Sequence, residues 1–330
     1  MQRKIVSWII FLLLLSALPL VIGEHGYAMR IVTLVLLFAA MGQSWNIVGG
    51  LANQISLGHA AFFGIGCYSS TLLLIHFGLT PWIGIVVGML IACVASLILS
   101  MPTMRLRGHY FALATLAFGE VMRAIANTWS SLTGGPVGIS VPFSKDSSFM
   151  LMQFKSNIPY YYLMLGMLVI TTGVFLAISY SKLGYRLRAI KENQDAAEVI
   201  GIHTTRIKIL ASVISAALMA ACGTLYAQFN FFFDPDTAFS LVDISVKVAL
   251  FCIVGGLGLA AGPILGAFII LPLEEILNIY LASHGAGVAQ LAYGMILILI
   301  ILLEPNGLLK LPARIRQYFR PKTTLGTSVH

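Results

Sequence analysis

Long apolar stretches alternate with short polar segments along the whole chain. An α-helix needs about 20 apolar residues to cross the ~30 Å hydrocarbon core of a bilayer. Backbone groups in lipid must be hydrogen-bonded within their own segment, so apolar stretches of this length predict helices. Ten stretches qualify, and they lie at 5–22, 30–48, 55–77, 82–101, 109–128, 158–180, 208–228, 244–262, 264–281 and 288–304. The pattern predicts an all-α, polytopic transmembrane helical bundle of about ten spans (8–10) that forms a single domain over residues 1–330.

Three boundaries in this pattern allow a second interpretation. Arg3 and Lys4 precede the first apolar stretch in the manner of a signal peptide. That stretch is long, however, and no small-x-small cleavage site follows it, so we interpret it as the first span. The connections at 49–54 and at Gly262–Pro263 are very short. Either neighbouring pair of stretches could therefore form a broken or re-entrant element instead of two full spans.

One short motif occurs twice in the chain. The sequence I-V-G-G-L stands at 47–51 and again at 253–257. Internal repeats are common in transporters. In a chain this rich in Ile, Val, Gly and Leu, coincidence explains the recurrence equally well.

The composition agrees with a membrane protein. Hydrophobic residues make up 58% of the chain and charged residues 10%, whereas a soluble domain carries about 25% charged residues. Such a chain cannot cover itself with a polar surface. The formal net charge is +8, but the basic residues lie almost wholly between apolar stretches. They therefore indicate membrane topology and not a nucleic-acid partner.

The positions of Lys and Arg predict the orientation of the bundle. If the N-terminus is cytoplasmic, ten spans place 102–108, 181–207 and the basic tail 305–330 inside. This arrangement places 15 of the 20 Lys and Arg residues on the inner side. The other five are Arg30, Arg123, Lys145, Lys155 and Lys247. Cytoplasmic loops of membrane proteins are enriched in Lys and Arg. We therefore expect both termini in the cytoplasm and the segment 129–157 outside.

Motifs for nucleotide, metal or covalent chemistry are missing from the sequence. Without a GxxxxGK[ST] loop, the chain cannot bind ATP in the usual way. The GxGxxA match at 256–261 follows no soluble strand, so tight helix packing explains it better than dinucleotide binding. The four cysteines lie inside apolar stretches, without a CxxC or Cys/His cluster, which predicts buried thiols and no metal site. We therefore expect no cofactor on this chain and no enzymatic activity of its own.

The inner segment 181–207 contains the signal of a short helix. Asn193 is a suitable N-cap, Asp195 stands in the first turn where the helix dipole favours an acid, and Gly201 is a suitable C′ residue. A helix of about two turns is therefore predicted at 194–200. Because it is too short to be stable alone, its apolar side chains need a surface, and they are Ala196, Ala197, Val199 and Ile200. That surface is either a neighbouring loop of the same chain or a groove in a cytoplasmic partner.

This segment resembles the cytoplasmic motif of ABC importer permeases. These permeases carry E-A-A-x-x-x-G on the helix that contacts the ATPase, and the present chain has D-A-A-E-V-I-G at 195–201. The I-x-L-P sequence that follows in the family is absent here. The resemblance implies an ATPase-coupling segment that comprises Asn193, Asp195, Ala196, Ala197, Glu198 and Gly201.

Further segments resemble one branch of that family, the LivM-like branched-chain amino-acid ABC transporter permeases. They are N-Q-I-S-L-G-H-A-A-F-F-G-I-G at 53–66, R-G-H-Y-F-A-L-A-T-L-A-F-G-E at 107–120, T-G-G-P at 133–136 and R-A-I-K-E-N at 188–193. The resemblance covers residues 40–305. It implies a multi-pass permease subunit of the bacterial inner membrane that translocates Leu, Ile or Val by alternating access. The partners it implies are a homologous second permease chain, two ATPase subunits that bind ATP and Mg²⁺, and a periplasmic substrate-binding protein.

Polar residues within the spans are candidates for the translocation pathway. Glu120 and Arg123 share a helix face, so they can pair with each other or contact a zwitterionic substrate. Uncharged polar residues gather near the inner ends of two spans, where they either join helices or line the pathway. The candidate residues are Gln43, Asn46, Gln54, Ser56, His59, Tyr110, Glu120 and Arg123.

Three alternative functions remain open at this point. Urea-transport permeases share much of the family pattern. An ion-coupled secondary amino-acid transporter would need carboxylates within the membrane, and Glu120, Glu274 and Glu275 are available. A membrane enzyme is disfavoured because the sequence lacks a His/Asp or Cys cluster. Co-purification of an ATPase would distinguish an ABC permease from the last two classes.

Overall fold

The computed structural model describes residues 2–23, 26–143, 149–281, 287–304 and 307–311, and these are predominantly helical. Most of the tail predicted at 305–330 lies outside the described residues. The main elements are α1 (Gln2–Ile22), α2 (Tyr27–Ala52), α3 (His59–Phe77), α4 (Pro81–Thr103), α5 (His109–Thr128), α6 (Ser130–Thr133), η1 (Gly135–Val137), β1 (Ile139–Ser140), α7 (Asn157–Ser179), α8 (Lys182–Glu192), α9 (Gln194–Val199), α10 (Thr204–Asn230), β2 (Phe232–Phe233), α11 (Pro235–Ala238), η2 (Leu241–Val246), α12 (Lys247–Gly255), α13 (Gly262–Leu281), α14 (Val288–Leu303) and η4 (Leu308–Lys310).

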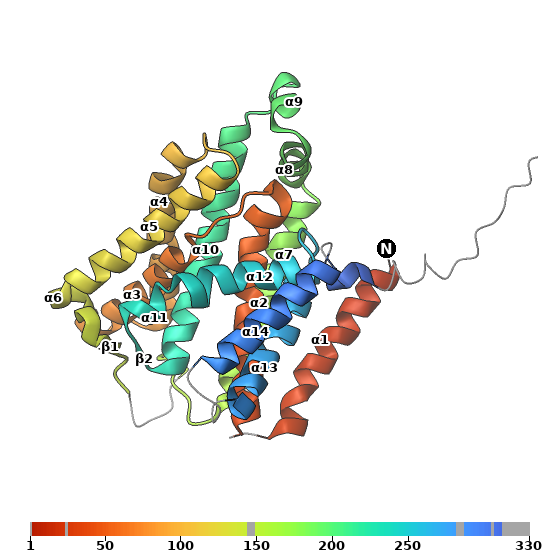
Figure 1. Ribbon diagram of the computed structural model, residues 1–330. Helices are drawn as coiled ribbons and strands as arrows, with labels where there is room; N and C mark the ends of the chain where they lie inside the picture. The colour runs from red at the N-terminus through yellow and green to blue at the C-terminus, as the bar shows by residue number, and fades with distance from the viewer. Residues whose placement is uncertain (1, 24–25, 144–148, 282–286, 305–306, 312–330) are drawn as a thin grey trace, which may run out of the picture.

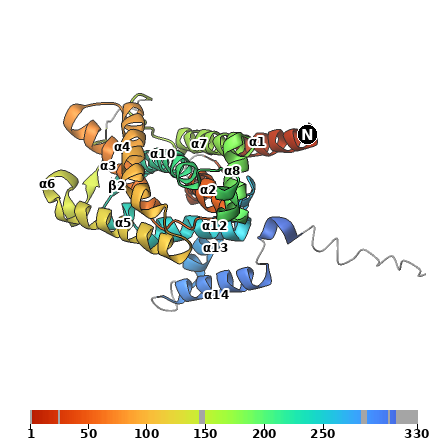
Figure 2. The same cartoon turned by 90° about the horizontal axis from the view of Figure 1, so that it is seen from above.

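Helices α2 and α10 lie inside a ring of other helices (Figures 1 and 2). In the most apolar part of α2, 83% of the residues are buried, and in α10 72%, against 33% in α4 and 28% in α13. The peripheral helices expose their apolar side chains, as Val86, Leu90 and Ile98 of α4 illustrate. An apolar outer face is what a bilayer requires. The chain is therefore a polytopic helical membrane protein.

The α3–α10 interface brings two backbones into direct contact. A Cβ atom at Gly66 would lie 1.9 Å from the carbonyl oxygen of Ala220, and one at Gly223 would lie 2.1 Å from that of Phe63. Glycine is therefore required at both positions. Small residues at helix interfaces permit such close approach in membrane proteins.

Seven helical segments among the described residues are long and apolar enough to cross a membrane. The sequence predicted ten spans, and α1, α5 and α14 are the three that this length and apolarity test does not include. Several boundaries match the prediction closely, and α5 begins and ends where the span 109–128 was placed. Asn53 adopts a left-handed conformation that ends α2, and α3 begins at His59, four residues later than predicted.

The predicted span 244–262 has different boundaries in the structure. The apolar helical segment runs from Pro235 to Gly255, and it includes the π-helical stretch η2. Gly256 has a φ angle of 130°, which strongly favours glycine. The helix therefore stops at Gly255, and residues 256–261 form a loop before α13. Apolar content alone did not reveal this break, because the loop is as apolar as the helix.

The 256–261 loop packs on the C-terminal end of α2. Asn46 donates from Nδ2 to the carbonyl oxygen of Leu259 at 3.1 Å, and its Oδ1 accepts from the N–H of Gly258 at 2.9 Å. A Cβ atom at Gly50 would lie 2.7 Å from that same nitrogen of Gly258. The two I-V-G-G-L segments thus lie close together, and the first provides a glycine for backbone contact with the residue that follows the second.

The end of the bundle opposite α8 and α9 carries the small strands (Figure 1). β1 and β2 pair antiparallel, with Ile139 opposite Phe233. This pairing ties the segment after α5 to the end of α10.

Candidate functional site

Helices α8 and α9 project from one end of the bundle (Figure 1). The sequence analysis missed α8, which begins after Ser181, whose Oγ accepts from two backbone N–H groups. Helix α9 confirms the predicted helix at 194–200 to within one residue. Asn193 is its N-cap as predicted, since Asn193 Oδ1 accepts from the N–H of Ala196 at 3.0 Å.

Helix α9 ends in a Schellman motif. Gly201 has a φ angle of 86°, the left-handed conformation predicted for the C′ residue. Its N–H donates to the carbonyl oxygen of Glu198 at 3.0 Å, and the N–H of Ile202 donates to that of Ala197 at 3.0 Å. These are the two hydrogen bonds of the motif. No atom lies within 4 Å of the position that a Cβ at Gly201 would occupy, so glycine is favoured there by backbone conformation alone.

The apolar residues of α9 divide into an inward and an outward set. Ala197 is 2% exposed and packs within this chain, whereas Val199 is 87% exposed and Ile200 is 74% exposed. Ala196 is also exposed. The sequence analysis left open whether these residues pack on this chain or on a partner. In the structure only Ala197 packs on this chain. The exposed apolar pair of Val199 and Ile200 indicates an interaction surface.

Both carboxylates of α9 have partners in neighbouring segments. Arg107, in the α4–α5 connection, donates to Asp195 from two nitrogens, at 2.6 and 3.1 Å. This hydrogen bonding and charge lower the pKa of Asp195 and raise that of Arg107. Glu198 accepts from Thr204 Oγ1 at 2.5 Å and from Gln194 Nε2 at 3.1 Å, and these hydrogen bonds lower its pKa. Both carboxylates of α9 are therefore ionised at neutral pH.

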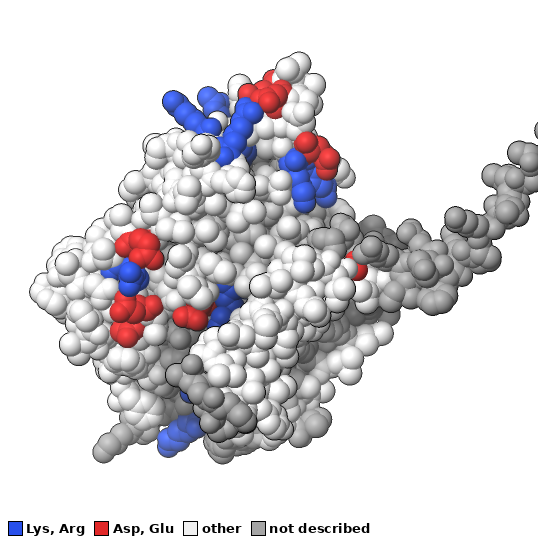
Figure 3. Space-filling view, viewed as in Figure 1, with Lys and Arg blue, Asp and Glu red and all other residues white. Residues whose placement is uncertain are grey.

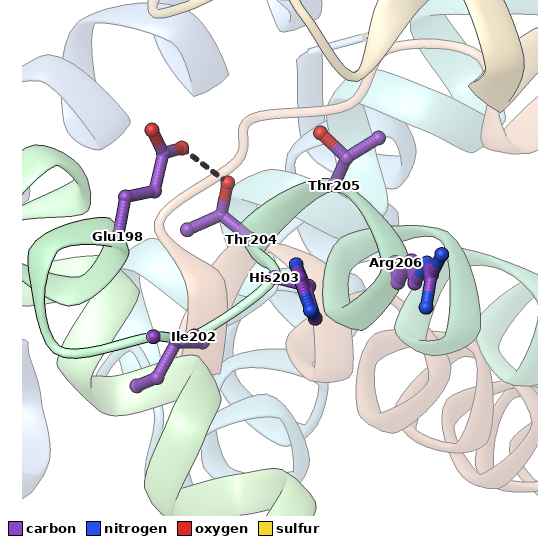
Figure 4. A pocket seen from close by; sticks show the side chains of 7 residues that line it. Glu198, Ile202, His203, Thr204, Thr205 and Arg206 are labelled. Carbon is purple, nitrogen blue, oxygen red and sulfur yellow. Dashed lines mark hydrogen bonds between the residues drawn. The ribbon is translucent and has the colours of Figure 1, made fainter.

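A hollow of about 530 Å³ lies beside the end of α9, between Glu198 and residues 201–206. Figure 4 shows the hydrogen bond between Glu198 and Thr204, with His203 beside it and Arg206 on the first turn of α10. In the sequence, the lining residues of this hollow stand on both sides of the exposed apolar pair, Val199 and Ile200. The turn after α9 therefore combines an apolar projection with a polar depression.

The buried polar candidates join helices to one another. Gln43 donates from Nε2 to the carbonyl oxygen of Ala260, and Asn46 holds the same loop. His59 lies with Nδ1 3.0 Å from Ser56 Oγ and with Nε2 2.9 Å from Ser215 Oγ of α10. These side chains have between 0% and 4% of their surface exposed. The interhelical hydrogen bonds that the sequence analysis considered are thus present.

Gln54 and Tyr110 have other surroundings. Gln54 is 7% exposed, and its Oε1 has no hydrogen-bond partner. It lines a second hollow, described below. Tyr110 is 73% exposed and lies on the outer face of α5.

Glu120 and Arg123 pair as their spacing predicted, with 2.8 Å between Glu120 Oε2 and Arg123 Nη2. Arg123 also pairs with Asp236 at 2.8 Å, a partner that the sequence analysis missed. Figure 3 shows that charge on this face is confined to a few small groups on an otherwise uncharged surface. The Glu120 and Arg123 side chains are 38% and 41% exposed, so the group lies at the protein surface.

The other carboxylates considered for ion coupling are also paired. Lys247 lies 2.9 Å from Glu274 and 3.6 Å from Asp243. Glu275 accepts from the hydroxyl of Tyr27 at 2.6 Å. Among the described residues, no group of three or more His, Cys, Asp or Glu side chains is arranged to hold a metal ion.

Several functional neighbours escaped the sequence analysis. Arg107 was noted as a topology signal and as part of a family motif, and Lys208 as a topology signal alone. Lys208 is 3% exposed, and its Nζ donates to Gln194 Oε1 at 2.6 Å. Lys208 stands close after the 194–200 helix in the sequence, whereas Arg107 lies 88 residues before Asp195. Nothing in the sequence says which residue of that helix each would meet.

Comparisons with known proteins agree with this arrangement. The family model for the permease component of branched-chain amino acid transport systems matches residues 27–303. The chain is 29% identical over 300 residues to the LivM permease protein of Escherichia coli strain K12, covering 84% of this chain and 69% of that protein. It is 26% identical over 298 residues to the LivH permease protein of Salmonella typhimurium, covering 85% and 94%. It is 27% identical over 277 residues to a probable LivH protein of Methanocaldococcus jannaschii, covering 82% and 85%.

No solved structure matches the chain. The family match extends from the first residue of α2 to the last residue of α14. The chain therefore belongs to the family of permease components of branched-chain amino acid transport systems.

Proposed function

We propose that this chain is the membrane-spanning permease subunit of an ATP-driven importer of branched-chain amino acids in the bacterial inner membrane. The family match along residues 27–303 supports the transport role. Relatives named as permease proteins of branched-chain amino acid transport systems support the substrate class. The chain performs no covalent chemistry in this proposal, because ATP and Mg²⁺ bind to partner ATPase subunits.

The observation that carries the ATP-driven mechanism is the geometry of α9. A six-residue helix, capped at both ends and tied to the chain by Arg107 and Thr204, presents Val199 and Ile200 away from the bundle. A short helix held this firmly is suited to transmit displacement. We infer that α9 docks in a groove of an ATPase subunit, with Asn193 and Gly201 fixing its ends and Asp195 and Glu198 fixing its orientation.

The remaining partners follow from the family. The chain resembles both LivM and LivH proteins, which supports pairing with a homologous second permease chain. Two ATPase subunits would then bind the two α9 helices, and a periplasmic binding protein would deliver substrate at the opposite end. That opposite end carries the Glu120–Arg123–Asp236 group.

Ten spans and cytoplasmic termini complete the proposal. Helices α1, α5 and α14 would then cross the membrane together with the seven longer apolar segments. The end of α1 that carries the N-terminus is directed toward the end of the bundle where α8 and α9 project (Figure 1). The Lys and Arg residues of 181–207 support a cytoplasmic location of that end.

Alternating access would proceed by closure of the ATPases, displacement of α9 and rearrangement of the helices around the pathway. Reconstitution of the full complex in proteoliposomes tests the function. ATP-dependent uptake of labelled leucine should be inhibited by unlabelled Ile and Val but not by urea. Competition by urea alone would reassign the substrate, and uptake driven by an ion gradient without ATP would refute the mechanism.

A further inference from the structure

A second hollow, of about 300 Å³, lies at the end of the bundle where α8 and α9 project. Its walls come from the end of α2, the connection 53–55, the start of α5, and helices α8, α9 and α10. It is separate from the hollow of Figure 4, which shares none of its residues. None of the residues that line it is Asp or Glu.

One side of this hollow is cationic. Arg107, Lys191 and Lys208 all line it. Lys208 is 97% buried, since its exposed fraction is 3%, and its hydrogen bond to Gln194 uses one of the three protons of the ammonium group. Gly108, the N-cap of α5, also lines the hollow and provides no side-chain cap for the first turn. The free N–H groups of a 20-residue helix add a positive potential there.

Gln54 adds a hydrogen-bond acceptor that requires a donor group on the ligand. Its side chain lines the hollow, is more than nine-tenths buried, and carries an Oε1 atom without a hydrogen-bond partner. Leaving a buried acceptor unpaired is unfavourable. A donor group of a ligand would remove that cost.

The rest of the lining includes the apolar side chains of Ile55, Phe111 and Ile190, together with the polar residues Asn53, His109 and Gln194. A ligand that fits all three parts has an anionic group, a donor group and a small apolar body. A zwitterionic amino acid with an aliphatic side chain has this combination. We propose that the hollow is a cytoplasmic binding site for such an amino acid, whose carboxylate meets Lys208 and the start of α5 and whose ammonium group meets Gln54.

The site is built from the same side chains that hold α9. Lys208 anchors Gln194, the first residue of α9, and Arg107 anchors Asp195. A carboxylate in the hollow competes for both cations, so occupancy changes how firmly α9 is held. The inference rests on the proposed function for its choice of leucine as ligand and for a link between α9 and the ATPase.

Equilibrium binding tests the site without transport. The complete complex is placed in nanodiscs without binding protein, and labelled L-leucine is titrated. Three unlabelled competitors separate the contacts: 4-methylpentanoate lacks the amine, 3-methylbutylamine lacks the carboxylate, and inorganic phosphate lacks both the amine and the apolar body. Leucine should compete best, and the amine should compete least.

Two variants assign the contacts. Lys208→Met should weaken leucine binding by about tenfold or more, the scale of one lost charged hydrogen bond. Gln54→Leu should weaken leucine binding while leaving competition by 4-methylpentanoate unchanged. Equal loss of both ligands in Gln54→Leu, or wild-type leucine binding in Lys208→Met, would overturn the assignment.

A thiol-protection experiment places the ligand. Ile55 is 48% exposed and lines the hollow, whereas Val199 is 87% exposed and lies outside it. Leucine should slow maleimide labelling of Ile55→Cys but not of Val199→Cys. Absence of protection at Ile55→Cys would refute the site even if leucine binds elsewhere in the complex.

Proteoliposomes distinguish the two sources of the ligand. The ligand could be transported substrate that leaves the pathway toward the cytoplasm. In that case Lys208→Met alters uptake even when no leucine is present on the cytoplasmic face. If it is cytoplasmic amino acid acting on α9, only leucine supplied at that face changes ATP hydrolysis, and Lys208→Met removes this response. Successful uptake without any binding in the nanodisc experiment would refute the site and leave the proposed function standing.

Discussion

Arg107 and Asp195 lie 88 residues apart in sequence and form a two-bond ion pair that ties the α4–α5 connection to the first turn of α9. Both side chains are more than half exposed, at 56% and 71%. Exposed pairs contribute little stability and are screened by salt. The pair therefore serves the orientation of α9 more than the stability of the fold.

This pair makes α9 sensitive to acid. The pKa of Asp195 is lowered by Arg107, so the stabilisation is present above the ordinary carboxyl range and is lost as pH falls through the lowered pKa. In Arg107→Gln the pKa of Asp195 should return toward its ordinary value, so α9 should be less protected than in the wild type at neutral pH and should lose less protection on acidification. Hydrogen exchange of the peptide 193–202 against pH measures this, with Arg186→Gln as control. Identical profiles for Arg107→Gln and wild type would contradict the role given to the pair.

Gly201→Val should weaken ATPase retention without reducing insertion or expression. The left-handed conformation of Gly201 costs a non-glycine residue about 1–2 kcal/mol, and a β-branched residue resists it most. Because a Cβ would meet no atom within 4 Å, the effect is confined to the end of α9. Gly201→Asn is the matched control, since Asn tolerates this conformation. Pull-down of the ATPase should rank wild type and Gly201→Asn above Gly201→Val.

The outward residues of α9 should separate docking from packing. Val199→Glu with Ile200→Glu places charges on an exposed surface, so the chain should insert and melt normally but lose the ATPase. Ala197→Arg instead forces a large side chain into a buried position and should lower both expression and thermal stability. Retention of the ATPase by the double Glu variant would exclude α9 as its docking helix.

The Glu120–Arg123–Asp236 group predicts an asymmetric charge swap. Glu120→Arg with Arg123→Glu preserves the pair within α5 but places a carboxylate beside Asp236, which lies 2.8 Å from Arg123 in the native chain. Transport should therefore recover only when Asp236→Lys is added. Uptake of leucine by the single, double and triple variants measures this. If the triple variant is as inactive as the worst single variant, a direct contact with substrate or binding protein explains the group better than structure does.

Reporter fusions test the topology. Fusions at His330 should report a cytoplasmic location and fusions at Lys145 an external one, because the Lys and Arg residues concentrate in the segments placed inside. A second cytoplasmic reporter at Lys182 serves as a control for the 181–207 segment. An external signal at His330 would mean that either the number of spans or the orientation is wrong.

Local signals in the sequence predicted much of this structure. The ends of α5 and both caps of α9 were correct, because apolar length and capping chemistry depend on neighbouring residues. The break at Gly256 was placed wrongly, since helix, π-helix and loop are equally apolar there. The pairing of Arg107 with Asp195 and of Arg123 with Asp236 was missed, because these partners lie 88 and 113 residues away. The inward direction of Ala197 follows from tertiary packing that no local pattern encodes.

The backbone contact between α3 and α10 has a mechanical consequence. Sliding one helix along another is normally accommodated by side chains that change rotamer, and here the carbonyl groups of Ala220 and Phe63 lie directly on glycine Cα atoms with no side chain between. Residues of one helix face recur after about one turn, 5.4 Å along the axis, and the residues one turn from Gly66, Phe62 and Ser70 among them, all carry a Cβ atom. Sliding between α3 and α10 is therefore unfavourable, and we expect the two helices to move together during a conformational change.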